Sequence, residues 1–122
     1  MLGRPEIKAD LSQVADLIEG RTVLATGAGG SIGSELCRQI ATFRPRRLIL
    51  TDSSEYLAFL LDNELRDAHP DLDIVTLLMN VRDRKRVDAV LSEYRPDAVF
   101  HAAALKHVPL VEANPLEAIK TN

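Results

Sequence analysis

The sequence lacks several features that would place it in well-known classes of protein. Cys37 is the only cysteine among 122 residues, so no internal disulfide can form and a reduced, cytosolic setting is the natural one. The opening stretch MLGRPEIKADLSQ is polar and has no apolar signal-peptide core, and no uninterrupted apolar run approaches the length of a membrane span. We therefore expect this chain to be soluble, with no direct membrane contact.

An excess of positive charge is also missing. The formal net charge is −3 and the sequence pI is about 5.6, so the charge balance does not attract nucleic acid or an anionic membrane. Two short arginine-rich stretches, at 44–47 and 82–86, each flank an apolar run, and we interpret both as solvated surface. With 46% hydrophobic and 27% charged residues, the length fits one globular domain with a modest core.

Apolar residues recur in patterns that alternate between strand and helix along the chain. Spacing of three and four predicts a short leading helix over 11–19. Four apolar runs that follow predict strands at 22–26, 47–51, 74–79 and 97–103.

The segments between these strands carry apolar stripes at helical spacing, which predicts a helix after each of the first three strands. We expect Ser53 or Ser54 to cap the second of these helices, Pro70 to end it, and Asp83 to cap the third. A further helix is predicted to begin at Leu116, close to the end of the chain.

This alternation defines the fold class. Strands that read as continuous apolar runs are covered on both faces, and strands that alternate with helices pair in parallel through right-handed crossovers. We predict an α/β fold, a Rossmann-like parallel sheet with helices on both faces, about four strands in the order 3-2-1-4, and a ligand crevice between the first and fourth strands. Domains of this type continue beyond the fourth strand, so we expect the sheet to be incomplete.

The segment TGAGGSIG at 26–33 is the strongest functional signal. Unsatisfied backbone N–H groups at a helix N-terminus bind a diphosphate, provided that side chains do not obstruct it. We expect Gly27 to allow a turn conformation closed to other residues, Gly30 to let the backbone approach the phosphates, and Gly33 to let the helix lie close to the sheet. The contacts themselves are expected from Ser31 and from the backbone amides of Gly29 to Ile32.

The surroundings of this turn predict its ligand. It follows an apolar strand, opens an amphipathic helix, and is followed nineteen residues after Gly33 by Asp52, at the end of the next strand. No Gly-Lys-Ser/Thr follows the turn, which excludes a P-loop. Asp52 is placed to accept hydrogen bonds from the adenosine ribose and to repel the extra phosphate of NADP, so the predicted cofactor is NAD. The alternative is that Asp52 only caps the next helix, a role for which Ser53 and Ser54 are better placed.

These motifs resemble those of one family over nearly the whole chain: the CapD-like polysaccharide biosynthesis proteins, UDP-N-acetylglucosamine 4,6-dehydratases of the extended short-chain dehydrogenase/reductase type. Glycines spaced three and three apart are typical of that superfamily. The segments that carry the resemblance are LGRP at 2–5, TGAGGSIGSELCRQI at 26–40, TDSSE at 51–55, VRD at 81–83 and HAAALKHVPLVEANPLEAIKTN at 101–122. The most specific part is LKHVP, at 105–109.

The resemblance implies an activity that this chain does not hold by itself. In that family hydride leaves C4 of the sugar for the bound dinucleotide, water leaves across C5 and C6, and hydride returns to C6, giving a 4-keto-6-deoxy sugar nucleotide. The acid and base groups of the family lie past a fifth strand, so we assign no catalytic residue here and expect the chain alone to be inactive. A related epimerase would share every motif, and a dinucleotide-binding module without turnover is the alternative from another class.

Further site residues follow from the resemblance. Ala102 is expected to pack against the adenosine side of the cofactor, and Lys106 to reach both the cofactor and the UDP-sugar substrate. His107 is a candidate substrate contact, although it could equally hydrogen-bond the backbone. We interpret His101 and His69 as structural.

Asn80 is a departure from the family pattern, which has Asp before Val-Arg-Asp to accept from the adenine amine. An amide oxygen can still accept, and the loss of charge weakens the bond by roughly 1 kcal/mol. Ser53, beside Asp52, and Val81, beside Asn80, complete the predicted cofactor-binding set. No metal site is expected.

The resemblance also implies an arrangement of the parent protein. We assign residues 1–20 to a linker and leading helix and residues 21–122 to the N-terminal half of an NAD-binding Rossmann domain. LGRP resembles the linker that follows a membrane-spanning region and an intervening domain in long family members. The parent would then be anchored in the bacterial inner membrane, with its catalytic domain on the cytoplasmic side. Extended relatives often dimerise through helices, so the parent is a candidate homo-oligomer.

Overall fold

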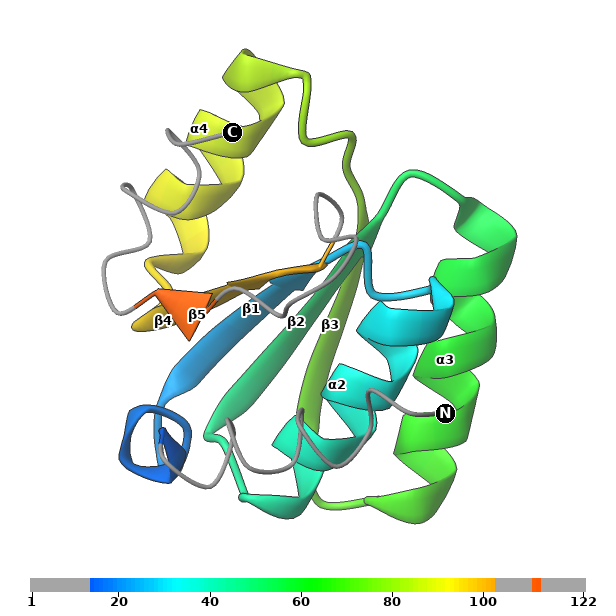
Figure 1. The fold of residues 1–122 in the computed structure, drawn as a ribbon, viewed down its shortest axis with the longest axis vertical. Coiled ribbons are helices and arrows are strands. Elements are labelled where there is room, and N and C mark those ends of the chain that lie inside the picture. The colour runs from blue at the N-terminus through cyan, green and yellow to red at the C-terminus, as the bar shows by residue number, and fades with distance from the viewer. Residues whose placement is uncertain (1–13, 103–110, 113–122) are drawn as a thin grey trace.

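The computed structural model describes residues 14–102 and 111–112 and contains one sheet (Figure 1). The strand order is β3-β2-β1-β4-β5. The pairs β1–β2, β1–β4 and β2–β3 are parallel, whereas β4 and β5 pair antiparallel. The strands are β1 (Thr22–Thr26), β2 (Arg47–Asp52), β3 (Asp73–Leu78), β4 (Ala98–His101) and β5 (Val111–Glu112). The predicted order of the first four strands is confirmed, while the two-residue β5 was not predicted.

Helices cover both faces of this sheet, as predicted. The helices are α2 (Ser31–Thr42), α3 (Glu55–Ala68) and α4 (Arg84–Tyr94). Helices α2 and α3 lie on one face and α4 lies on the other (Figure 1). The helix expected from Leu116 and the last part of the predicted strand 97–103 lie outside the described residues.

The core is divided into two clusters because successive strand side chains point to opposite faces. In β1, Val23 and Ala25 pack in the cluster under α2 and α3, whereas Leu24 between them packs with Val87 and Val90 of α4. All three β1 side chains are fully buried. Burial on both faces explains why β1 reads as a continuous apolar run.

The leading helix is shorter than the sequence pattern predicts. Within the described residues it is a single 3₁₀ turn, Ala15–Leu17. Directly after it, Ile18 is fully buried in the core and Glu19 pairs with Pro45 in an isolated bridge. Gly20 then turns with a φ of 70° and donates its N–H to the carbonyl of Arg44. These contacts with the α2–β2 connection end the helix where local spacing would have continued it.

The starts of α3 and α4 agree with the predicted caps. The Ser54 hydroxyl accepts the N–H of Leu57 at 3.2 Å, which selects Ser54 over Ser53 as the cap of α3. The Asp83 carboxylate accepts the N–H of Arg86 at 3.2 Å at the start of α4. Helix α3 ends at Ala68, before the predicted stop at Pro70.

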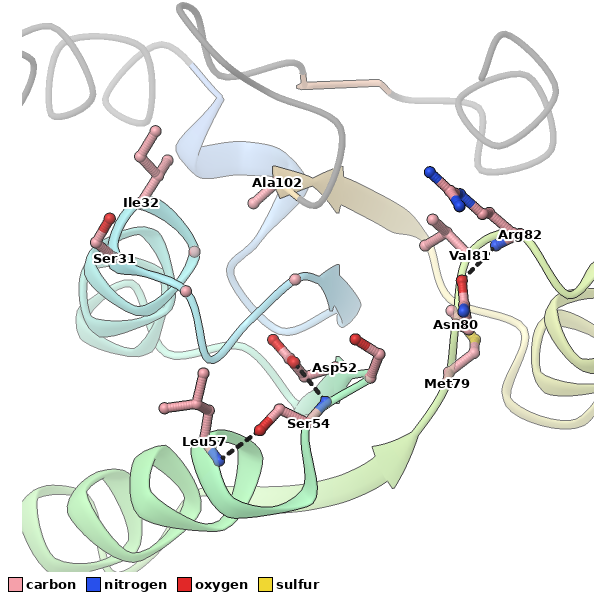
Figure 2. Close-up of a pocket in the computed structure, with 14 residues that line it drawn as sticks. Ser31, Ile32, Asp52, Ser54, Leu57, Met79, Asn80, Val81, Arg82 and Ala102 are labelled. Atoms are coloured by element: carbon pink, nitrogen blue, oxygen red, sulfur yellow. Dashed lines mark hydrogen bonds between the residues drawn. The ribbon is translucent and has the colours of Figure 1, made fainter.

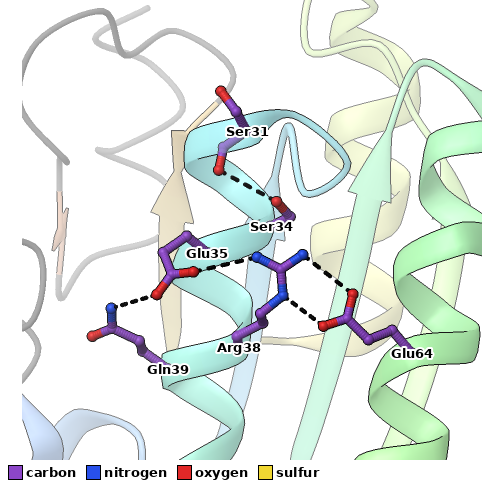
Figure 3. Close-up of polar contacts among 6 residues, drawn as sticks. All are labelled: Ser31, Ser34, Glu35, Arg38, Gln39 and Glu64. Atoms are coloured by element: carbon purple, nitrogen blue, oxygen red, sulfur yellow. Dashed lines mark hydrogen bonds and ion pairs between the residues drawn. The ribbon is translucent and has the colours of Figure 1, made fainter. Parts of the chain in front are cut away.

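An ion pair connects α2 with α3 at the surface (Figure 3). The Arg38 guanidinium donates to both carboxylate oxygens of Glu64, with Nε–Oε2 at 2.6 Å and Nη2–Oε1 at 3.2 Å. It also contacts Glu35 one turn earlier on α2. The hydrogen bonds from Arg38 lower the pKa of the Glu64 carboxyl. The pair links the two neighbouring helices at the exposed surface, where such ion pairs add little to stability.

In the part of the chain that the structure describes, no helix combines the length and apolar character needed to cross a bilayer.

Candidate functional site

A cleft of about 580 Å³ lies at the carboxyl ends of the strands (Figure 2). Open α/β sheets bind their ligands at this edge, where the strand order reverses. The cleft is lined by Gly27, Gly30, Ser31, Ile32, Gly33, Asp52, Ser53, Ser54, Leu57, Met79, Asn80, Val81, Arg82 and Ala102. Every predicted cofactor residue within the described part of the chain lines it except Gly29. Lys106 and His107 lie outside the described residues.

The glycine turn between β1 and α2 forms one wall of this cleft. Gly27 has a φ of 64°, the left-handed region that favours glycine, as the sequence predicts. Next to it, Ala28 donates its N–H to the carbonyl of Thr51 on β2 at 3.0 Å. A Cβ at Gly33 would collide with the carbonyl oxygen of Gly27. Gly33 therefore lets the helix close onto its own turn, while its expected role in bringing the helix close to the sheet stays a prediction.

Gly29 supports the cleft without lining it. Its N–H donates to Asp52 Oδ2 at 2.7 Å. A Cβ at Gly29 would lie 2.5 Å from the Cβ of Leu57 at the start of α3. The absence of a side chain lets the turn pack against α3.

The N-terminus of α2 opens into the cleft without a protein cap. The N-cap residue is Gly30, no side chain of the described residues accepts a hydrogen bond there, and the first turn holds no acidic residue. The first helical hydrogen bond from this cap runs from Ser34 N–H to the Gly30 carbonyl. Of the predicted amides, Gly29 N–H already donates to Asp52 and Gly30 N–H to the Gly27 carbonyl. It is therefore the N–H groups of the first helical turn, from Ser31 on, that with the positive end of the helix dipole favour an anion at this position.

Asp52 lies where the β1, β2 and α3 segments meet. Its side chain is only 8% exposed, and Oδ2 holds the Gly29 N–H while Oδ1 accepts the Ser54 N–H at 2.8 Å. The carboxylate thus connects the glycine turn to the start of α3; its Ser54 contact lies close to the capping alternative given by the sequence, whereas its Gly29 contact was not predicted. A carboxylate oxygen has lone pairs for more than one donor, so hydroxyl groups in the cleft can still bind it.

The sequence prediction missed four lining residues: Met79 and Arg82 at the lip beyond β3, and Ser54 and Leu57 at the start of α3. Met79 is 5% exposed and joins the core cluster under α4, and Leu57 of α3 forms another apolar part of the lining. Arg82, interpreted from sequence as plain surface, is exposed but lines the cleft. The missed positions lie on separate elements, and only the tertiary fold brings them together.

Asn80 is held by its own turn. Its Oδ1 accepts the N–H of Arg82 at 2.9 Å, and its backbone carbonyl accepts the N–H of Asp83 at 2.9 Å. The sequence prediction assigned this amide oxygen to an adenine amine, whereas the structure shows it accepting a backbone donor.

Beside the cleft, His101 at the end of β4 is buried, with 1% exposure. Its Nδ1 lies 2.7 Å from the hydroxyl of Thr26 at the end of β1. Burial lowers the pKa of His101, so the ring is neutral near pH 7. Among residues 14–102 and 111–112, its Nε2 has no hydrogen-bond partner. The contact joins the two central strands under the crevice, in accordance with the structural interpretation of this residue.

Residues 23–122 match the polysaccharide biosynthesis protein family. The chain belongs to this family. Over its full length it is 44% identical to the "Probable polysaccharide biosynthesis protein EpsC" of Bacillus subtilis, of which it covers 21%. It is 32% identical, over 87% of the chain, to a UDP-N-acetylglucosamine 4,6-dehydratase (inverting) of Campylobacter jejuni, of which it covers 30%.

The fold has close counterparts among solved structures. The first ketoreductase of the tylosin PKS superposes with a TM-score of 0.60 and 33% identity, over 73% of this chain and 20% of that one. The chain spans between a fifth and a third of the length of the relatives named above. The family and the Rossmann-like, short-chain reductase fold predicted from the sequence are thus confirmed.

Proposed function

We propose that this chain is the NAD-holding part of a nucleotide-sugar 4,6-dehydratase that acts on UDP-N-acetylglucosamine in bacterial polysaccharide biosynthesis. The observation that carries the proposal is the uncapped N-terminus of α2, which opens into the 580 Å³ cleft at the carboxyl ends of the adjacent strands β1 and β4, where the strand order reverses. The family supports the assignment of a sugar-nucleotide substrate, because a relative named UDP-N-acetylglucosamine 4,6-dehydratase (inverting) aligns with 87% of the chain.

The cleft fits the adenosine diphosphate half of a dinucleotide. The left-handed Gly27 and the side-chain-free Gly30 leave the amides of the first α2 turn open to a diphosphate. Asp52, at the end of the neighbouring strand β2, offers its remaining lone pairs to ribose hydroxyls. Ala102, 7% exposed at the end of β4, forms the opposite wall.

The charge of Asp52 supports NAD over NADP. The phosphate on the adenosine ribose of NADP would meet a carboxylate that is held in place by two backbone amides and cannot swing away. Two negative charges that face each other across a cleft repel, and solvent screens that repulsion little when one of them is mostly buried. The bound nicotinamide would supply hydride acceptance and return, while the described residues bind and orient its adenosine half.

In this protein, cofactor binding and catalysis would be carried out by different sets of residues. Among the described residues, those at the cleft offer backbone donors, serine hydroxyls, an amide, a guanidinium, one carboxylate and apolar walls, and they include no pair of groups suited to acid and base catalysis at a sugar. We therefore infer that turnover needs residues outside the described segments.

Calorimetric titration of the chain with NAD and with NADP tests the binding part. We expect NAD to bind and NADP to bind at least about tenfold more weakly, a difference of roughly 1.4 kcal/mol. Comparable affinities would remove the assignment of Asp52 to cofactor choice, and absence of binding by both would remove the proposed function. Incubation of the chain with NAD and UDP-N-acetylglucosamine should give no keto sugar, and its appearance would place the catalytic groups in this chain.

A further inference from the structure

The strand order of the sheet positions the parts of an adenosine diphosphate ligand, and this inference rests on the proposed function. The uncapped end of α2 follows β1, Asp52 ends β2 one strand away, and Met79 to Arg82 follow β3 one strand further out. Adjacent strands lie roughly 4.8 Å apart. A ligand with its diphosphate on α2 and its ribose at Asp52 therefore extends its base toward the lip beyond β3.

The orientation of the Asn80 amide at this lip is set by its neighbour. A backbone N–H can only donate, so the Asn80 atom that meets Arg82 N at 2.9 Å is the carbonyl oxygen. The NH₂ group of the same amide has no hydrogen bond within the described residues. Asn80 is exposed and lines the cleft, so it presents two N–H donors to a ligand.

The other side chains of the lip supply no competing oxygen acceptor. Met79 and Val81 are apolar, and the Arg82 guanidinium is a donor only. Of the nearby carboxylates, Asp52 accepts two backbone amides and gives its remaining lone pairs to the ribose in the proposed function, and Asp83 accepts from Arg86 and does not line the cleft. In the described structure, the polar side-chain groups of the lip for which no hydrogen bond is found are therefore the N–H donors of Asn80 and Arg82.

We propose that Asn80 sets the base preference of the site, so that the base is bound through a hydrogen-bond acceptor and a 6-oxo purine is accepted as readily as a 6-amino purine. The 6-amino group of adenine is a donor and gains nothing from a facing NH₂ group. The 6-oxo group of hypoxanthine accepts from the same NH₂. An aspartate at position 80 would reverse this, because one oxygen could keep the Arg82 N–H while the other accepts from the adenine amine.

The test compares NAD with nicotinamide hypoxanthine dinucleotide by calorimetric titration of the 122-residue chain. For the unsubstituted protein we expect the hypoxanthine dinucleotide to bind as tightly as NAD or more tightly. In Asn80→Asp we expect NAD to bind at least about tenfold more tightly than the hypoxanthine dinucleotide, because a charge-assisted hydrogen bond is gained with one and an acceptor–acceptor contact with the other.

Asn63→Asp is the matched control. Asn63 is exposed on α3 and does not line the cleft, so the same change of charge there should leave the ratio of the two affinities as it is without substitution. Circular dichroism spectra identical to that of the parent chain establish that both variants are folded.

The outcomes separate this inference from the proposed function. If the chain binds NAD but binds the hypoxanthine dinucleotide at least tenfold more weakly, the role of Asn80 is overturned while the cofactor site stands. Equal affinities that Asn80→Asp leaves equal also overturn it. Binding of neither dinucleotide overturns the proposed function and this inference with it.

Discussion

Helices α2 and α4 both begin at the carboxyl edge of the sheet, yet their N-termini are built in opposite ways. Helix α4 begins with the Asp83 cap, followed by the basic residues Arg84, Lys85 and Arg86. Helix α2 begins with Gly30, has no side-chain cap and carries neither acid nor base in its first turn. In α4 a protein carboxylate lies at the positive end of the dipole and accepts one of the free amides, whereas the N-terminus of α2 has no carboxylate among the described residues and remains open to an external anion.

The presence or absence of a side-chain cap thus distinguishes a helix N-terminus that stabilises the fold from one that can bind a ligand. A cap adds roughly 1 kcal/mol of stability, so an uncapped end beside a cleft gives up that stability. The substitutions below test the contrast, beginning with the largest expected effect.

Gly33→Ala should be the most damaging, because the new Cβ would collide with the Gly27 carbonyl oxygen and deform the turn. We expect the free energy of unfolding in urea to fall by about 3 kcal/mol and NAD binding to be lost. Gly30→Ala is the matched control. Its Cβ would lie 3.5 Å from the same oxygen, an ordinary contact, so stability should change by less than about 1 kcal/mol. Equal destabilisation of the two variants would contradict this account of the turn.

Asp52→Ala should have the next largest effect. It leaves the N–H groups of Gly29 and Ser54 without their carboxylate acceptor. We expect a loss of about 2 kcal/mol in the free energy of unfolding, together with much weaker NAD binding. If stability is unaffected, the bridge between the glycine turn and α3 contributes nothing, and Asp52 is a ligand contact only.

Asp83→Ala removes the cap of α4. The N–H of Arg86 loses its acceptor, and the three basic residues of the first turn then face the helix dipole alone. We expect destabilisation of about 1 kcal/mol by urea unfolding. Asp83 does not line the cleft, so the affinity for NAD should not change. A parallel loss of NAD affinity would show that the two helix ends are not independent.

Ser31→Asp should have the smallest effect on stability and an opposite one on binding. A carboxylate in the first turn of α2 interacts favourably with the helix dipole, so the free energy of unfolding should rise by about 0.5 kcal/mol. The same charge would occupy the anion position, and we expect the affinity for NAD to fall at least tenfold. A variant that gains stability and still binds NAD normally would mean that the diphosphate does not sit at α2.

Much of the fold was predictable because each element carries its own signal. β1 was bounded correctly because its residues are buried on both faces, so the apolar run ends where burial ends. Ser54, Asp83 and the glycines act through local backbone geometry, which sequence spacing records. The leading helix was overestimated because its end depends on a bridge to Pro45, more than twenty residues away.

The candidate site was predictable only where its residues belong to a motif. Gly27 and Asp52 stand at fixed offsets from strand ends, so spacing located them in the cleft. Leu57 and Arg82 have no such signal, because a leucine in a helix or an arginine in a charged loop has the same sequence pattern whether or not it lines a cleft. The hydrogen bonds of Asp52 and Asn80 were also hidden, since which oxygen meets which amide depends on how separate segments approach each other.

Cys37, fully buried in the α2 face of the core, gives this protein an internal reporter. Burial raises the pKa of its thiol to about 12, so in the folded chain the sulfur is neither accessible nor ionised at neutral pH. A thiol-specific reagent can then react only during transient opening of the core, and its labelling rate measures how often that opening occurs. Because Cys37 is the only cysteine in the chain, each substitution above can be ranked by one labelling experiment without an attached probe.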